Sequence, residues 1–299
     1  MAESFHYGGQ AVIEGVMIRG KEALAISVRQ ANGQLNVVKQ PLASIYKGRL
    51  RQTPFIRGII ALVETLVLGT QSLLHSAQIA AAEEGEEKIP AAVLWGTVAV
   101  SLALGVVLFF MVPLFATRYL IDPYIESALL SNVFEGLIRI GIFVAYLKLI
   151  SLISDIRKVF AYHGAEHKVV NAYEAGVPLD VESVKRYSTA HARCGTAFLF
   201  IVLIVAIFVF ALVGQPTLWI RIVSRIALIP VIAIISYEIM KFGASHSENP
   251  VVRILLAPGL LLQAITTREP DDSQIEAAIS ALNEVIRIDQ TAESGSTTT

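Results

Sequence analysis

Charged residues are scarce in this chain. Asp, Glu, Lys and Arg make up 16% of its 299 residues, whereas 54% are hydrophobic. A soluble domain usually carries about 25% charged residues, so the deficit predicts a membrane protein. The formal net charge of −1 lacks the basic excess of a nucleic-acid-binding protein, so we expect no nucleic-acid partner.

Cysteine is almost absent as well. Cys194 is the single cysteine, which excludes an internal disulfide framework. A secretory signal peptide is also missing, because residues 1–6 lack a basic start followed by an apolar run. We therefore expect the N-terminal region to remain in the cytoplasm.

Long apolar runs are what the chain has instead. Four of them, at 91–115, 133–153, 196–213 and 220–240, are long enough to cross about 30 Å of hydrocarbon. Lys and Arg gather before the first run, between the second and third, and after the fourth. Because basic residues accumulate in cytoplasmic loops, this alternation predicts a multi-pass protein of the plasma (inner) membrane with both termini in the cytoplasm.

Residues 56–82 are also long and apolar, but they carry a polar stripe. Arg57, Glu64, Gln71 and Gln78 recur every seven residues. Such a stripe is typical of an amphipathic helix at the membrane interface, or of one that faces a bundle interior. If this segment spanned, the most basic link would lie outside the cell, so we expect it to lie on or dip into the membrane.

Both ends of the chain are predicted to be soluble. Asn32-Gly33 separates two β-prone stretches and predicts a hairpin with a type I′ turn. Near the other end, residues 251–262 are apolar but short, which favours a re-entrant or interfacial segment. Ser273-x-x-Glu276 predicts a capping box that opens a cytoplasmic helix. Residues from Thr291 are expected to form a disordered tail.

These features predict a mainly α fold: a polytopic membrane helix bundle of about four spans, with a small N-terminal β-hairpin domain and a C-terminal cytoplasmic helix. The expected organisation is a Gly-rich and β-hairpin segment at 1–54, an amphipathic or interfacial helix with an acidic linker at 55–90, a transmembrane bundle at 91–241 containing a cytoplasmic His/Cys segment at 154–195, and an interfacial segment, helix and tail at 242–299.

The strongest candidate for a functional site is His163-Gly-Ala-Glu166-His167, which holds two imidazoles and a carboxylate. Residues i and i+4 of a helix lie on one face, so both imidazoles can reach one ion. The spacing is that of the H-x-x-E-H inverted zincins, in which two His bind zinc and the Glu is the base. The pattern predicts a zinc site with Glu166 as the catalytic residue. A hydrogen-bonded structural cluster is the alternative, because helix ends at the cytoplasmic interface commonly carry His, Lys and Arg.

A catalytic zinc site uses three protein ligands, so a third is needed. The same segment offers Glu174, His191 and Cys194, and we expect His191 or Cys194 to complete the site. Cys194 is also a candidate nucleophile, since Arg193 and His191 would lower the pKa of its thiol. A small buried hydrophobe is the commoner role of a lone cysteine.

Other polar residues near span ends have weaker claims. His246 is a further candidate ligand, although an interfacial loop is the favoured interpretation of its surroundings. Arg221 and Arg225, one turn apart near the outer end of the fourth run, are expected to snorkel outward. Glu14 is predicted either to alternate outward from a strand or to join a polar site at the end of the second span.

Four motifs in order resemble the bacterial YqhQ family. They lie at Gly8–Gly20, Tyr162–Lys168, Ser188–Gly195 and Pro258–Asp272, and the resemblance covers nearly the whole chain. It implies a multi-pass membrane protein of a family labelled a predicted metal-dependent enzyme. It therefore implies the positions to test, which are His163, Glu166, His167, His191 and Cys194, and it supplies no substrate.

Two functions remain in view. The first is a zinc-dependent hydrolase with a site at the cytoplasmic face, acting on a peptide or lipid-derived substrate that enters from the bilayer. The second is a non-enzymatic membrane scaffold or assembly partner, whose soluble ends form a docking platform. The lipid bilayer is an expected partner in both, together with a membrane-protein partner or a second copy of the chain. A transporter is disfavoured, because the spans hold few charges.

Overall fold

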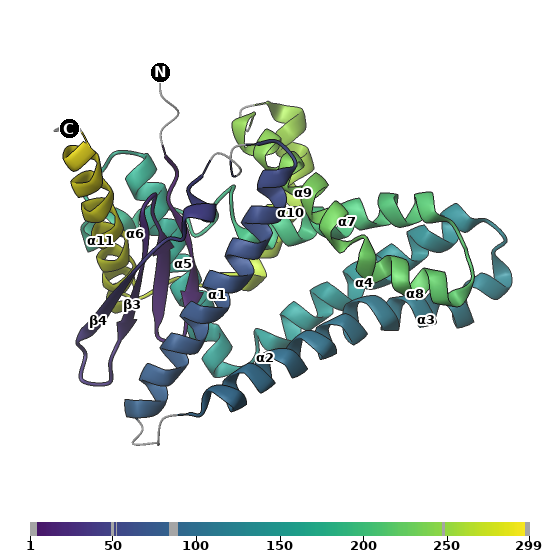
Figure 1. The fold of residues 1–299 in the computed structure, drawn as a ribbon, viewed down its shortest axis with the longest axis horizontal. Helices are drawn as coiled ribbons and strands as arrows, with labels where there is room; N and C mark the ends of the chain where they lie inside the picture. Colours follow the sequence, from purple (N-terminus) through teal and green to yellow (C-terminus); the bar gives the residue numbers. More distant parts are fainter. Residues whose placement is uncertain (1–4, 49–50, 52, 84–88, 247–248, 297–299) are drawn as a thin grey trace.

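The computed structural model describes residues 5–48, 51, 53–83, 89–246 and 249–296. A small sheet with its covering helices lies at one end, and an elongated helical bundle extends away from it (Figure 1). The predicted mainly helical class, with N-terminal β structure and a C-terminal helix, is confirmed. The acidic linker at 84–88 lies outside the described residues.

The N-terminal sheet has four antiparallel strands in chain order. They are β1 (Gly8–Val12), β2 (Gly15–Arg19), β3 (Ala23–Arg29) and β4 (Leu35–Pro41), and the 3-10 turn η1 (Ser44–Tyr46) follows. The predicted hairpin is β3–β4, with Arg29 opposite Leu35. Its turn is not type I′, because that type needs two positive φ angles. Of the two predicted turn residues only Gly33 has one, at 83°.

The glycine-rich segment supplies β1 and β2, which the sequence did not predict as strands. A Cβ on Gly15 would lie 2.1 Å from the carbonyl oxygen of Ser27 on β3, so only glycine allows these strands to approach there. Glu14 occupies the turn between β1 and β2 with a φ of 51°. Its side chain pairs with Lys158 at 3.1 Å.

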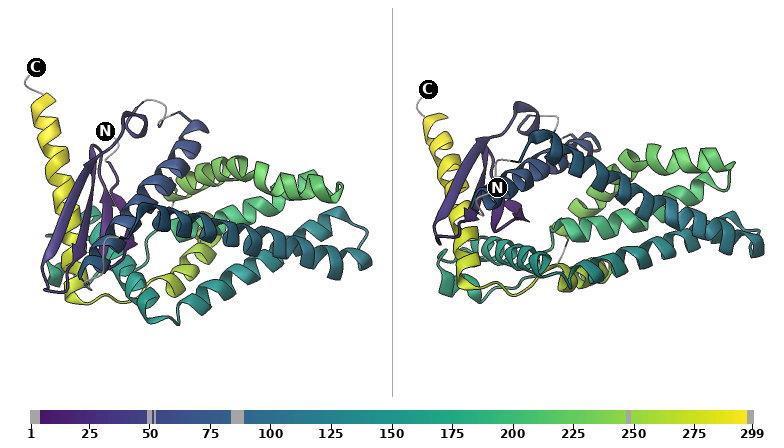
Figure 2. Two further views of the ribbon diagram at one scale, coloured as in Figure 1. Left: turned by 60° about the horizontal axis from the view of Figure 1, so that its bottom comes forward. Right: turned by 90° about the horizontal axis from the view of Figure 1, so that it is seen from below.

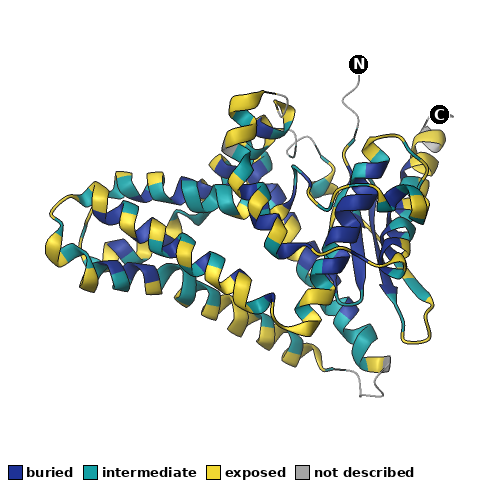
Figure 3. Ribbon diagram, turned by 180° about the vertical axis from the view of Figure 1, so that it is seen from behind, coloured by how far each residue is buried: buried dark blue, intermediate teal, exposed yellow. Residues whose placement is uncertain are grey.

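Helices cover both faces of the sheet (Figures 1 and 2). Helices α5 (Ser154–Glu174) and α11 (Asp272–Ser296) bury one face, where Val16 and Ile18 point. Helix α1 (Ile56–Glu83) covers the other, where Met17 and Leu24 point. Successive β2 residues alternate between the faces, as the pleat requires, and the buried residues concentrate in this part (Figure 3).

The bundle contains the predicted apolar runs. It is built from α2 (Ala91–Val106), the π-helical turn η3 (Val107–Met111), α3 (Val112–Leu120), the 3-10 turn η4 (Asp122–Tyr124), α4 (Ala128–Ile150), α7 (Gly195–Val213), α8 (Leu218–Ala227) and α9 (Ile229–Ser245). By length and composition, three helices of the described part can cross a membrane, and up to five if each bent pair counts as one span. The chain is therefore a multi-pass membrane protein.

Two of the predicted spans lie in bent helix pairs. Helices α8 and α9 meet at 45°, and α4 meets α5 at 102°. The first bend falls beside Pro230, in the first turn of α9, where the missing N–H is tolerated. The second bend turns α5 away from the bundle and onto the sheet, so the His segment lies beside the sheet.

Helix α1 turns two residues of its polar stripe toward the protein, whereas Gln71 of the same stripe is exposed. Glu64 accepts from Arg19 on β2 at 2.9 Å, and Arg57 pairs with Glu238 on α9. The opposite face leaves Val63 and Leu66 exposed. The helix also meets the length and hydropathy criteria for a span, so its placement on the membrane stays a prediction.

The C-terminal part differs from expectation at both ends of α11. Its N-cap is Asp271, whose Oδ1 accepts from Gln274 N–H while Gln274 Oε1 accepts from Asp271 N–H. The capping box thus begins two residues before Ser273, whose hydroxyl donates to Asp271. The helix continues to Ser296, so the expected disordered tail is wrong over 291–296. Within that stretch, the Thr291 hydroxyl bonds to the carbonyl of Arg287 inside the helix.

Candidate metal centre

The two histidines of the central motif lie on one continuous helix. His163 and His167 are one turn apart on α5, and their ring centroids are 4.4 Å apart. His167 is buried and His163 half-buried. The predicted same-face arrangement is therefore present.

Backbone carbonyls fix the orientation of both rings. His163 Nδ1 donates to Thr266 O at 2.8 Å, and His167 Nδ1 donates to Thr189 O at 2.6 Å. A carbonyl can only accept, so Nδ1 must carry the proton in each ring. In this tautomer an imidazole carries its lone pair on Nε2, which is the arrangement that metal-binding histidines use.

Cys194 supplies a third donor atom. Ligand atoms of His163, His167 and Cys194 all lie within 4.8 Å of one another, and the sulfur is 3.2 Å from His163 Nε2. Cys194 is the N-cap of α7 and accepts from Thr196 N–H at 3.4 Å.

His191 does not join this group, although it lies beside it. Its ring is 5.7 Å from that of His167. Nδ1 accepts from Arg193 N–H at 3.4 Å, and Nε2 lies 3.5 Å from Glu174 Oε2. Burial lowers the pKa of His191, and the negative charge of Glu166 only partly opposes this. The geometry therefore favours Cys194 over His191 as the third ligand.

Glu166, which directly precedes His167 on α5, lies beside the two histidines. Its Oε1 accepts from the backbone N–H of Gly9 on β1 at 2.9 Å, and its Oε2 lies 3.6 Å from His167 Nε2. The carboxylate is 4% exposed. Strand β1 thus holds one oxygen and leaves the other directed at the histidine.

A small cavity of about 50 Å³ opens between these groups, enough for an ion or a water molecule. Its walls come from β1, α5 and the start of α7. They are formed by Tyr7, Gly8, Gly9, His163, Glu166, His167, His191, Arg193, Cys194 and Gly195.

The donor set fits a metal ion. His167 Nε2 and Glu166 Oε2 lie 3.6 Å apart. Two imidazole nitrogens and a sulfur face the same cavity. A cation among these atoms would satisfy all of them, and imidazole with thiolate is a set that zinc prefers.

The remaining sequence candidates lie elsewhere or play other parts. His246 bonds to Phe242 O at 3.0 Å on the exposed end of α9, away from the cavity. Glu14 contacts Lys158 rather than the histidines. Glu174 pairs with Arg193 and His191 at the rim.

Sequence reasoning missed the residues that hold the ligands. The carbonyls of Thr189 and Thr266 and the amide of Gly9 leave no side-chain signal, because the backbone makes the contact. Gln263 does leave one, since it is a polar residue in the apolar helix α10 (Pro250–Thr266). It is 1% exposed and bonds to the backbone of His191.

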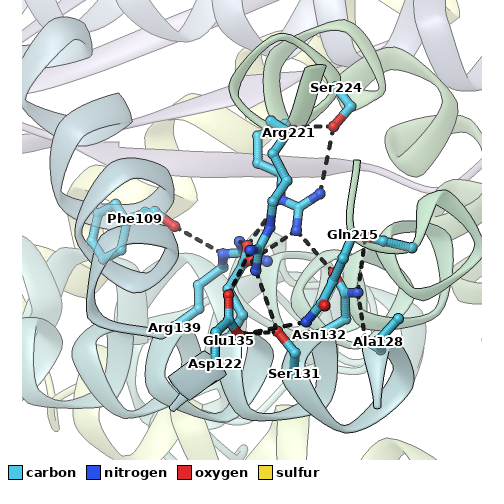
Figure 4. Close-up of polar contacts among 12 residues, drawn as sticks. Phe109, Asp122, Ala128, Ser131, Asn132, Glu135, Arg139, Gln215, Arg221 and Ser224 are labelled. Carbon is cyan, nitrogen blue, oxygen red and sulfur yellow. Dashed lines mark hydrogen bonds and ion pairs between the residues drawn. The ribbon is translucent and has the colours of Figure 1, made fainter. Parts of the chain in front are cut away.

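A second polar cluster lies inside the bundle, and it corrects a prediction (Figure 4). Arg221 and Arg225 do not snorkel outward: they are 2% and 0% exposed. Both bind Glu135 of α4, which also holds Arg139 at 2.7 Å. Apolar surroundings favour this arrangement, because each guanidinium finds a carboxylate within the protein.

Asp122 and a freed carbonyl complete the second cluster. Asp122 pairs with Arg221 at 2.8 Å, and Arg139 Nε donates to Phe109 O at 2.8 Å. Phe109 lies in the π-helical turn η3, where the ordinary helical hydrogen bonds are interrupted and a carbonyl becomes available. The Glu135–Arg139 spacing, i and i+4 in an apolar run, is the signal that could have revealed this cluster.

Comparisons with known proteins agree with the resemblance to the YqhQ family. A family model described as "Protein of unknown function (DUF1385)" matches residues 53–288. The chain is 35% identical over 300 residues to "Uncharacterized protein YqhQ" of Bacillus subtilis, which covers 96% of this chain and 94% of that protein. No solved structure matches the chain.

Proposed function

Because this chain belongs to the DUF1385 family of unknown function, we propose its function from the cavity between β1, α5 and α7. It is a membrane-embedded, metal-dependent hydrolase that uses zinc. The observation that carries the proposal is the convergence of one ligand atom each from His163, His167 and Cys194 within 4.8 Å, with both Nδ1–H groups bound to carbonyls.

His163, His167 and Cys194 are the proposed ligands. Three protein ligands leave a position open for water or substrate, as catalytic zinc sites require. Bound zinc would act there as a Lewis acid toward an oxygen atom. The two histidine rings are already held in the tautomer that binding requires.

Glu166 is the proposed general base. Its Oε1 is held by Gly9 N–H, so Oε2 is the oxygen available to take a proton within the cavity. His191 is assigned no ligand role: neutral and buried, it borders the cavity and connects it to Glu174 at the rim.

The site belongs at the cytoplasmic face of the plasma membrane, with both termini inside. Cys194 and Gly195 begin the apolar helix α7, so the cavity lies at the end of a span. The distribution of Lys and Arg places this end inside. A peptide or lipid-derived substrate entering from the bilayer suits this location.

A second candidate rests on one contact. Cys194 Sγ lies 3.2 Å from His163 Nε2, a distance at which a histidine can activate a thiol for nucleophilic attack. In that case the protein is a cysteine-dependent hydrolase or acyltransferase, and no metal is needed.

Metal analysis of the purified full-length protein separates these candidates. We expect about one zinc per chain, lost in His167→Ala and in Cys194→Ser. His246→Ala is the matched control, because His246 lies outside the cavity, and it should retain the metal. A metal-free wild type would end the zinc proposal. Rapid alkylation of Cys194 that slows in His163→Ala would then favour the thiol.

A further inference from the structure

The three proposed ligands come from separate parts of the chain. His163 and His167 belong to α5, whereas Cys194 is the last residue of an irregular segment, 186–194, that leads into α7. The sulfur approaches His163 Nε2 to 3.2 Å. Whatever holds this segment therefore determines whether the thiol and the imidazoles can share one ion.

Helix α5 holds the first part of the segment. Asn171 Nδ2 donates to the carbonyls of Ser188 and Ala190 at 2.9 and 3.0 Å. His167 Nδ1 donates to the carbonyl between them. These bonds to the backbone of the segment end at Ala190, and beyond it Glu174 of α5 pairs with the side chains of His191 and Arg193.

Gln263 of α10 holds the last part. Its Oε1 accepts from the backbone N–H of His191 at 2.9 Å, and its Nε2 donates to the carbonyl of the same residue at 2.8 Å. The side-chain amide thus pairs with His191 as one strand residue pairs with another. Because Gln263 is 1% exposed, water does not replace either bond.

The same end of α10 also contacts α5. Thr266 O accepts from His163 Nδ1 at 2.8 Å, and Arg268 N–H donates to Phe160 O at 2.9 Å. Helix α10 and the residues that follow it therefore contact both α5, which carries the histidines, and the segment 186–194, which carries the thiol. Gln263 provides the side-chain contact with 186–194.

We propose that Gln263 is a positioning residue for Cys194. By fixing both backbone groups of His191, its amide sets the place of the thiol relative to His163 and His167. The inference rests on the proposed function in one respect, namely that these three residues bind a metal. Gln263 acts through the backbone and touches no ligand side chain.

Cobalt titration of the full-length protein in detergent tests this role. The thiolate-to-cobalt charge-transfer absorption reports the sulfur–metal bond directly. A change in the overall stability of the protein would not by itself alter this absorption. Gln263→Met keeps the side-chain length and removes both polar atoms. We expect it to weaken cobalt binding about 10- to 100-fold and to lower the charge-transfer absorption at saturation.

Ser236→Ala is the matched control. Ser236 is also a buried polar residue of an apolar helix, α9, and its substitution removes only the hydroxyl bond to Ile232 O, outside the lining of the cavity. It should bind cobalt within about twofold of the wild type, well short of the loss typical of a broken ligand support. Wild-type affinity and absorption in Gln263→Met would overturn the proposal.

Gln263→Glu serves if the methionine variant does not fold. It keeps the volume and an acceptor for His191 N–H but turns a carboxylate oxygen toward the His191 carbonyl. The same loss of the charge-transfer absorption is expected, and wild-type absorption would again overturn the role.

Alkylation of Cys194 by iodoacetamide distinguishes failure of the two proposals. If the wild type binds no cobalt, the proposed function fails. The positioning role then still predicts several-fold faster alkylation in Gln263→Met than in Ser236→Ala, because the released thiol leaves its buried place. Equal alkylation rates would overturn the positioning role by itself.

Discussion

Gly164 and Arg268 lie closer than a side chain at position 164 would allow. A Cβ on Gly164 would lie 2.1 Å from the carbonyl oxygen of Arg268. Arg268 N–H also binds Phe160 on the same helix. The glycine between the two histidines therefore permits the segment after α10 to pass directly against α5.

Gly164→Ala should consequently destabilise the protein, although alanine is favoured over glycine in a helix by about 1 kcal/mol. The displaced segment follows Thr266, whose carbonyl orients His163, so zinc affinity should fall as well. Thermal unfolding in detergent and zinc titration measure the two effects. Gly141→Ala in α4 is the control, since nothing lies within 4 Å of its added Cβ. Equal stability of the two variants would contradict the packing role.

Removing the charge of Glu135 should strongly destabilise the protein, because three buried arginines form ion pairs with this carboxylate. We expect Glu135→Gln to cost about 3–5 kcal/mol, the range for breaking a buried ion pair from one side. Unfolding by denaturant in micelles measures this loss. Glu126→Gln changes an exposed residue and should leave stability unchanged. A similarly small effect at Glu135 would show that the cluster is not coupled to folding.

The start of α11 offers a direct comparison between the predicted and the observed cap. Asp271→Ala removes the acceptor of the Gln274 N–H and should cost about 0.5–2 kcal/mol. Ser273→Ala should cost less, because its hydroxyl only donates to Asp271. Chemical denaturation of the two variants decides between them, and the reverse order would restore Ser273 as the cap.

The buried imidazole of His191 should make stability depend on pH. Burial lowers its pKa in the folded protein, whereas the unfolded residue titrates at about 6.5. Below that pH the unfolded chain binds a proton that the native protein does not, so stability should fall as the pH decreases. The free energy of unfolding of the chelator-treated protein should be measured between pH 7 and pH 5, a window around the ordinary histidine pKa. It should decrease less in His191→Gln than in the wild type. Identical slopes would refute this origin.

Local patterns were sufficient for much of this structure. The apolar runs predicted the bundle, and the His163–His167 spacing predicted a shared face, because a helix converts spacing into geometry. The hairpin around Gly33 followed for a similar reason. Each of these features depends on residues that are close in the sequence.

Features that depend on distant contacts escaped prediction. The burial of Arg225 requires Glu135, 90 residues earlier, and a single helix gives no sign of that partner. The choice between His191 and Cys194 depends on the course of an irregular segment held by Gln263. Strand β1 is short and rich in glycine, so its propensity is low, and its pairing with β2 becomes visible only in the sheet.

The cluster around Glu135 has a consequence for how the chain enters the membrane during synthesis. Helix α4 carries Glu135 and Arg139 as an internal pair, so its charges partly neutralise each other before any partner arrives. Helix α8 carries Arg221 and Arg225 with no acidic residue of its own. An arginine costs about 2.5–3.5 kcal/mol at the centre of an inserting helix, and less near one end of an apolar run, where Arg221 and Arg225 lie. Pairing with Glu135 offsets this cost, so we expect α8 to insert more stably once α4 is in place, an order that follows the sequence.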